Sequence, residues 1–247
     1  MNKTILKTGV LSLVLFMVLP FKNFTKAQNI KEDLFEINKA YQEAPEFSLE
    51  IAIETKLKGK AKDSIIEKSE GFVRKKDVLL HNRIGYIESV RTASMVLSVN
   101  HNNKTMFVSE PSNSISFSSG EITGSIDRAL KISSSTTFSE NKTTGHYVIY
   151  FSESPLKRLE FTFDKKSKFI TQILITEPYI PETELVNPDK NPWLEYEYSV
   201  VFDKITVTPE FLKTDFSTWE FLYQKGNEFV ASQKYSDYKI INQIPAK

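Results

Sequence analysis

The sequence predicts a mainly β protein of the α+β class, a curved antiparallel half-barrel with helices closing its concave face. One amphipathic helix stands near the start of the chain, and many later segments alternate apolar and polar residues with a period of two. Helical patterns are too few to cover both faces of a sheet of roughly nine to eleven strands. A sheet of that size leaves exposed edges unless it curls or is covered, which favours the half-barrel.

The first helix is expected at Ile30–Tyr41, and Pro45 ends it. Its apolar positions recur at spacings of four, three and four: Ile30, Leu34, Ile37 and Tyr41. Immediately afterwards the period changes to two, which predicts a long strand at Phe47–Leu57 with one apolar face.

Further strands follow from the same alternation and from turn residues between segments. They are expected at Ile65–Lys75, Val78–Ile84, Thr92–Val99, Lys104–Glu110, Gly145–Ser152, Arg158–Lys165, Lys168–Thr176, Trp193–Thr208, Ser217–Gln224 and Lys239–Gln243. A second, short helix is expected at Ser125–Ile132, after a Ser/Gly-rich loop at Ser112–Gly124. The four prolines of Pro178–Pro192 predict a long loop. No repeat or linker divides residues 28–247, which we therefore interpret as a single domain.

Residues 1–27 have the pattern of a secretory signal peptide. Lys3 and Lys7 precede the apolar run Gly9–Leu19, which is too short to span a membrane. Small residues at Thr25 and Ala27 suit a cleavage site before Gln28. The pattern predicts an exported, soluble protein without a permanent membrane anchor, and an uncleaved anchor is the alternative interpretation.

The composition excludes several classes of function. The 247 residues contain no cysteine, so disulfides, thiol nucleophiles and thiolate zinc sites are excluded. The 32 basic and 31 acidic residues nearly balance, which argues against a nucleic-acid binder. No cofactor motif occurs.

No catalytic constellation is recognisable, so we expect no enzyme and no metal site. His81, His101 and His146 stand in separate elements, where we interpret them as a solvated turn residue (His101) and ordinary strand residues. Ser154 and Lys157 have the spacing of a serine–lysine nucleophile, but they lie between strands rather than on a helical turn. Glu195 and Glu197 share one strand face, which we expect to be the solvent side.

The strands are rich in Phe and Tyr, and this richness has two interpretations. Aromatic residues favour strands and fill the core beneath a wide sheet. They also line apolar cavities between a curved sheet and its helices. Composition alone does not decide between a packed core and a cavity.

The order of elements resembles the LolA-like family of periplasmic lipoprotein carriers. The resemblance rests on the signal peptide, the helix Ile30–Tyr41, the strand from Phe47, and the segments Glu70–Lys76, Phe161–Ile173 and Val200–Val207 with Pro209. It implies an incomplete antiparallel barrel closed by helices, a location in the Gram-negative periplasm (secretion otherwise), and binding of lipoprotein acyl chains without catalysis.

The leading hypothesis is an exported binding protein that holds an acyl chain, a lipoprotein or a similar apolar ligand in the half-barrel. The helix and the first strand would supply the ligand-binding residues: Leu34, Ile37, Tyr41, Leu49, Ile51 and Ile53. The alternative is an exported protein-interaction module without a small-molecule ligand, whose strand edges or Pro178–Pro192 loop dock an envelope protein.

Overall fold

The computed structural model describes residues 30–59, 63–111, 119–152, 154, 156–178, 194–212, 214–226 and 228–244. The predicted signal peptide lies outside these residues, as do positions 112–118 and 179–192 of the two predicted loops and the first residue of the strand predicted at Trp193–Thr208. Within the described ranges, neither helix has the length and apolar character that crossing a membrane requires.

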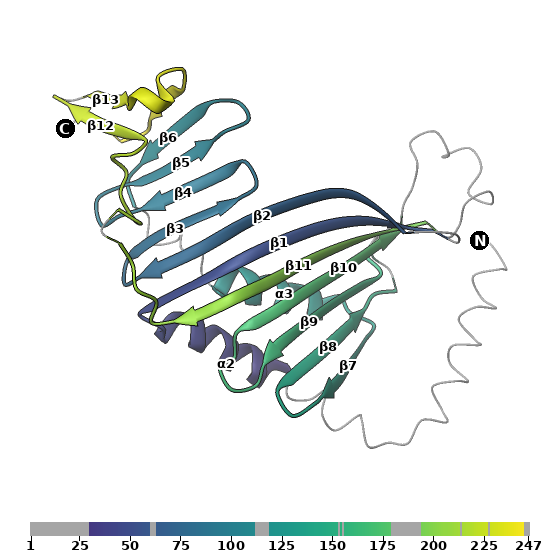
Figure 1. The fold of residues 1–247 in the computed structure, drawn as a ribbon. Helices are drawn as coiled ribbons and strands as arrows, with labels where there is room; N and C mark the ends of the chain where they lie inside the picture. The colour runs from purple at the N-terminus through teal and green to yellow at the C-terminus, as the bar shows by residue number, and fades with distance from the viewer. Residues whose placement is uncertain are drawn as a thin grey trace, which may run out of the picture.

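Over the described residues, the fold is one large sheet with two α-helices and a small hairpin (Figure 1). The helices are α2 (Ile30–Glu43) and α3 (Ser119–Lys131), and a short 3-10 helix spans Gln233–Tyr235. The strands of the large sheet are β1 (Glu46–Lys58), β2 (Ser64–Lys76), β3 (Leu79–Ile84), β4 (Ile87–Arg91), β5 (Val96–Asn100), β6 (Thr105–Ser109), β7 (Ser135–Glu140), β8 (Thr144–Tyr150), β9 (Arg158–Asp164), β10 (Ile170–Pro178), β11 (Glu195–Val207) and β14 (Lys239–Asn242). β12 (Leu222–Lys225) and β13 (Glu228–Ala231) form the hairpin.

The sheet runs in the order β14-β6-β5-β4-β3-β2-β1-β11-β10-β9-β8-β7 and stays open, with β14 and β7 at its two edges (Figure 1). The mainly β class is confirmed. The expectation of a wholly antiparallel sheet is wrong, because β14 runs parallel to β6.

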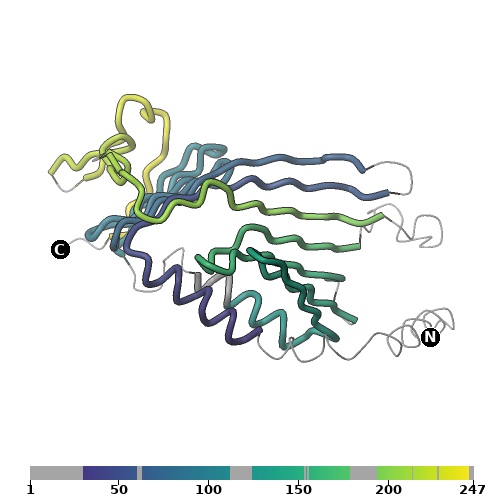
Figure 2. The backbone as a smooth tube through the Cα atoms, turned by 60° about the horizontal axis from the view of Figure 1, so that its bottom comes forward, coloured from purple at the N-terminus to yellow at the C-terminus, as the bar shows by residue number. Residues whose placement is uncertain are grey.

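Helix α2 confirms the predicted amphipathic helix and lies on one face of the sheet (Figure 2). Its buried stripe packs against β1, whose alternate residues Phe47, Leu49 and Ile51 point toward it. The Lys75 ammonium of β2 donates hydrogen bonds to the carbonyls of Tyr41 and Gln42 in the last turn of the helix, and to that of Ala44 directly after it. These bonds satisfy carbonyl groups that a helix end leaves without an intrahelical partner.

A second core lies on the opposite face of the same sheet. Leu49 is paired across the strands with Val73, and Val73 with Asn82, so all three face the helices. By the same pairing, Ser89 of β4 faces the helices and its neighbour Val90 faces away. The buried residues on Val90's side belong to β4, β5 and β6 and to the C-terminal chain: Val90, Leu97, Val99, Met106, Val108, Phe221, Leu222 and Tyr235.

Residues 214–226 and 228–244 are here called the C-terminal segment. Apart from β14, which belongs to the sheet, this segment covers the β4–β6 end of the face that the helices leave open (Figure 2). Sequence alternation shows that a strand has an apolar side but not which side of the sheet that is. The helices accordingly cover one end of the sheet on one face, and the C-terminal segment covers the other end on the other face.

Several boundaries differ from the prediction for identifiable reasons. The strand expected at Thr92–Val99 begins at Val96, and β4 precedes it unpredicted because Glu88 occupies a buried position and masks the alternation. β7 is an edge strand with a single large apolar residue, Phe138, and gives almost no pattern. β13, in the C-terminal hairpin, was also not predicted. Helix α3 begins at Ser119, earlier than the predicted start at Ser125. The prediction missed its first turns because they are rich in Ser and Gly and resemble a loop in sequence.

Candidate functional site

The predicted ligand-binding residues meet in the layer between α2 and the sheet. Five of them are buried in one continuous core: Leu34, Ile37, Tyr41, Leu49 and Ile51. Ile53 is half-buried and packs against the margin of that core. Periodicity predicts that these residues lie together, because they share one face of a helix and one face of a strand, and their role in binding a ligand stays a prediction.

The same face continues along the long strands beyond the fully buried region. On β1, exposure rises from 0% at Leu49 and 3% at Ile51 to half-buried at Ile53 and Leu57. On β11, Phe202 is buried, and the residues that follow on the same face, toward the Glu195 end, are half-buried: Val200, Tyr198 and Tyr196. On β10 the corresponding residues are Ile173 and Ile175. We call this set the apolar strip: Ile53, Leu57, Ile173, Ile175, Tyr196, Tyr198 and Val200.

The strip exists because the strands are longer than the helices. A 14-residue helix spans about 21 Å, whereas a 13-residue strand spans about 43 Å. Both views show β1, β2 and β11 extending past the helices toward the same end of the sheet (Figures 1 and 2). The strip is thus the part of the helix-bearing face that α2 is too short to cover.

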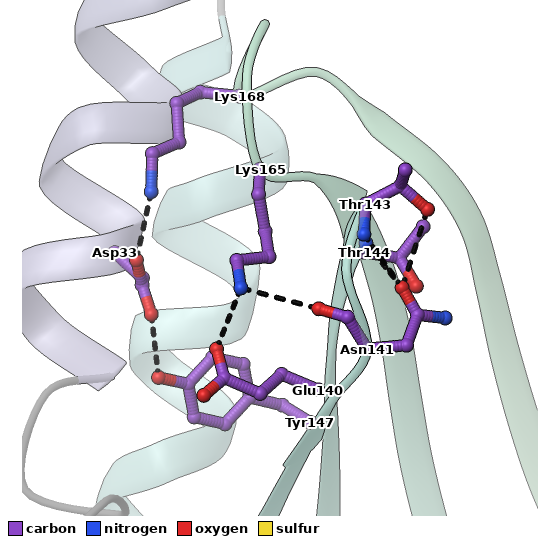
Figure 3. Close-up of polar contacts among 8 residues, drawn as sticks. All are labelled: Asp33, Glu140, Asn141, Thr143, Thr144, Tyr147, Lys165 and Lys168. Carbon is purple, nitrogen blue, oxygen red and sulfur yellow. Dashed lines mark hydrogen bonds and ion pairs between the residues drawn. The ribbon is translucent and has the colours of Figure 1, made fainter.

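The N-terminal end of α2 is attached to the sheet by a polar contact at Asp33 (Figure 3). One carboxylate oxygen accepts a hydrogen bond from the Tyr147 hydroxyl of β8 at 2.8 Å, and the other pairs with the Lys168 ammonium at 3.1 Å. Burial raises the pKa of Tyr147 above its ordinary value, and the Asp33 charge raises it further. The tyrosine therefore stays protonated and keeps donating to Asp33.

Beside this contact, a second set of bonds fixes the β7–β8 turn (Figure 3). Lys165 donates to the Glu140 carboxylate and to the Asn141 carbonyl, while the Asn141 side chain accepts from the backbone of Thr143 and Thr144. An asparagine that accepts bonds from the amides two and three residues ahead stabilises the turn itself. We interpret these contacts as structural.

The two buried tyrosines of this layer allow a matched test. The Tyr41 hydroxyl lies beside the Ile170 backbone, but it has no hydrogen-bond partner among the described residues. We expect Tyr147→Phe to lower the free energy of unfolding by about 1–2 kcal/mol, because a hydrogen bond to a charged group is lost. Tyr41→Phe should leave it unchanged or raise it slightly. Urea unfolding of both variants measures the difference, and equal losses would contradict the assignment.

The residues considered for catalysis are held in pairs with neighbours. His146 contacts Glu160 at 2.9 Å, and Glu195 pairs with Lys157 at 2.6 Å. Glu197 was expected on the solvent side, but it is buried and paired with Lys58. Among the described residues there is no group of three or more His, Cys, Asp or Glu side chains suited to a metal ion.

The expectation of a solvated His101 is wrong. Its imidazole contacts the carboxylate of Glu88 at 2.8 Å and the Tyr238 hydroxyl at 3.0 Å. Its sequence context, an Asn-rich turn, contains no sign of this burial, because Tyr238 comes from the distant C-terminal segment.

The opposite face carries a groove of about 730 Å³ over β1, β2, β3 and β11. Cations line it, but two of them are already paired: Arg74 with Asp215 and Lys204 with Glu50, each at 2.8 Å. The acids Glu70 and Asp203 also line it, so the groove presents charges of both signs. The apolar strip is therefore the better candidate for a ligand surface.

No protein-family model and no curated protein matches the chain. Among solved structures, an uncharacterized conserved protein from Thermus thermophilus is similar at 7% identity and a TM-score of 0.41, over 86% of this chain and 98% of that one. A LolA superfamily protein from Nitrosomonas europaea is similar at 6% identity and a TM-score of 0.30, over 76% and 96%. A DUF1329 family protein from Desulfovibrio piger is similar at 8% identity and a TM-score of 0.32, over 76% and 95%. Similarity this distant carries no argument about function. A LolA superfamily protein, of the family that the residue pattern resembles, is thus among the structures to which the chain is similar.

Proposed function

We propose that this protein binds an acyl chain, a lipoprotein acyl group or a similar apolar ligand on the apolar strip, without catalysing a reaction. The observation that carries the proposal is the continuous apolar face that passes from buried residues beneath α2 to half-buried residues on β1, β10 and β11. Half-buried aliphatic and aromatic side chains aligned on adjacent strands offer a long apolar surface, which suits an extended hydrocarbon chain.

The energetics of such binding are favourable without any new polar contact. Burying a methylene group stabilises the complex by about 0.8 kcal/mol, so a partly covered chain of about ten carbons contributes several kcal/mol. We further propose that the sheet and helices act as one half-barrel, that the protein is exported to the periplasm, and that an envelope protein exchanges the ligand with it.

Adjacent residues of β11 provide a matched pair of variants. Val200 lies in the apolar strip, whereas Val201 is 38% exposed on the opposite face. We expect Val200→Asn to raise the dissociation constant of a fluorescent long-chain fatty acid about tenfold or more, because the amide is desolvated beneath the chain. Val201→Asn should change it less than about twofold.

Fluorescence titration measures both constants, and near-UV circular dichroism checks that each variant keeps the native fold. Equal effects of the two variants, or no saturable binding by the unchanged protein, would contradict the proposed site. In the second case the alternative function, a protein-interaction module, is favoured. Its specific support is the exposure of Leu212 and Trp219, both more than 70% accessible, before and within the C-terminal segment.

A further inference from the structure

A carboxylate is held between two imidazoles beneath the C-terminal segment. Glu88 of β4 is only 7% exposed, and it faces away from the helices. One of its oxygens lies 2.7 Å from Nε2 of His81, and the other lies 2.8 Å from Nε2 of His101. Both histidines are diagonal neighbours of Glu88 on the sheet, on β3 and directly after β5.

The contacts of His81 specify its protonation. Its Nδ1 lies 2.7 Å from the backbone carbonyl oxygen of Asp215, which only accepts hydrogen bonds, so Nδ1 must carry a proton. Its Nε2 faces a carboxylate oxygen, which accepts as well. Both bonds form together when His81 is an imidazolium and Glu88 is ionised.

His101 needs no additional proton. Its Nε2 donates to Glu88, and its Nδ1 accepts from the Tyr238 hydroxyl at 3.0 Å. Burial opposes the Glu88 charge, yet the hydrogen bonds from both imidazoles hold the pKa of this carboxyl below its ordinary value. The extra proton of the cluster therefore resides on His81.

The other charged and titratable groups around the cluster are already engaged or lie at its margin. Arg74 of β2, paired across the strands with His81, forms an ion pair with Asp215. From the C-terminal segment, the Tyr235 ring stands 6.1 Å from His101, and the Lys234 ammonium lies over that tyrosine at 4.9 Å. Arg83 of β3, paired across the strands with Glu88, donates its Nε–H to the Gly85 carbonyl at 3.2 Å. None of these side chains supplies the acceptors that His81 uses, because Asp215 contributes its backbone carbonyl.

Both histidines reach the C-terminal segment, His81 at Asp215 and His101 at Tyr238. We propose that Glu88, His81 and His101 form a proton-dependent clasp that holds the C-terminal segment on the sheet and loosens it when His81 loses a proton. Neutral His81 has one N–H for two acceptors, so either the bond to Glu88 or the bond to Asp215 is lost. Because loss of that proton removes one of these two bonds, raising the pH favours release. Release uncovers the apolar face of β4, β5 and β6.

Two measurements on the full-length protein test the clasp. ¹⁵N NMR of the imidazoles should show both nitrogens of His81 protonated where the C-terminal segment is fully protected, and one proton lost where that protection falls. Hydrogen exchange, corrected for intrinsic rates, should show protection of the C-terminal segment falling about tenfold or more across that same titration, the effect of one charged hydrogen bond. Protection of β1 and β11, which contain no histidine, should stay constant.

Two variants separate the clasp from a general effect of pH. His81→Gln should abolish the pH dependence of protection in the C-terminal segment. His146→Gln removes a histidine with the same kind of carboxylate contact, to Glu160, and should preserve it. A single proton on His81 while the C-terminal segment is fully protected would overturn the proposal, even if His81→Gln fails to fold. So would protection that is constant across the His81 titration.

Discussion

Replacing Phe161 with alanine is expected to lower the free energy of unfolding by about 3 to 5 kcal/mol, which is typical of a buried aromatic residue. Phe161 is 1% exposed and lies in the layer between α2 and the sheet. Its ring stacks on Tyr147 at 5.1 Å and approaches Phe163 at 6.4 Å, so truncation leaves a cavity that strands on both sides keep from collapsing.

Phe35→Ala is the matched control for this prediction. Phe35 belongs to α2 but is 65% exposed, so the same substitution should change the stability by less than about 0.5 kcal/mol. Urea unfolding followed by circular dichroism measures both. A loss below about 1 kcal/mol for Phe161→Ala would mean that this layer is not the close-packed core described above.

Replacing Glu88 with alanine is expected to cost about 3 kcal/mol, because a buried partner of two imidazoles is removed. Glu160→Ala is the control, since its partners His146 and Arg158 are both about one third exposed and water replaces the lost contacts. We expect about 1 kcal/mol or less there. Urea unfolding at neutral pH compares the two losses of stability. Equal losses would contradict the explanation that burial makes the Glu88 contacts stronger.

The lowered pKa of Glu88 also gives this prediction a pH dependence. A carboxyl whose pKa is lower in the folded state contributes stability above its unfolded pKa, and this contribution is lost as the pH falls through the folded pKa. The difference between the native protein and Glu88→Ala should therefore shrink on acidification below the ordinary carboxyl range.

The sequence was sufficient for elements whose pattern is regular. Helix α2 and strand β1 were predicted within one or two residues, because each has an uninterrupted apolar face and a proline at Pro45 separates them. Strand β4 was missed because a buried charge, Glu88, occupies a position where alternation requires an apolar residue. The buried charge is stabilised by a hydrogen bond to His101. Only the folded sheet brings that partner to Glu88, so the local sequence does not reveal it.

The sheet order and the polar contacts depend on distant parts of the chain. β1 pairs with β11, and Asp33 contacts residues 114 and 135 positions away. The six apolar site residues could be grouped from periodicity alone, since periodicity defines a face. Whether that face continues past the helix as a half-buried strip depends on strand length and on which strands are neighbours, and these follow only from the assembled sheet.

A photoactivatable fatty acid tests the proposed binding surface most directly. The full-length protein is irradiated with a diazirine-labelled palmitate, and the adducts are mapped by peptide mass spectrometry, with unlabelled palmitate as competitor. We expect competable adducts on the apolar strip, chiefly around Ile53, Leu57 and Val200. Adducts confined to the C-terminal segment or to the Val201 face, or labelling that no competitor reduces, would contradict the proposal.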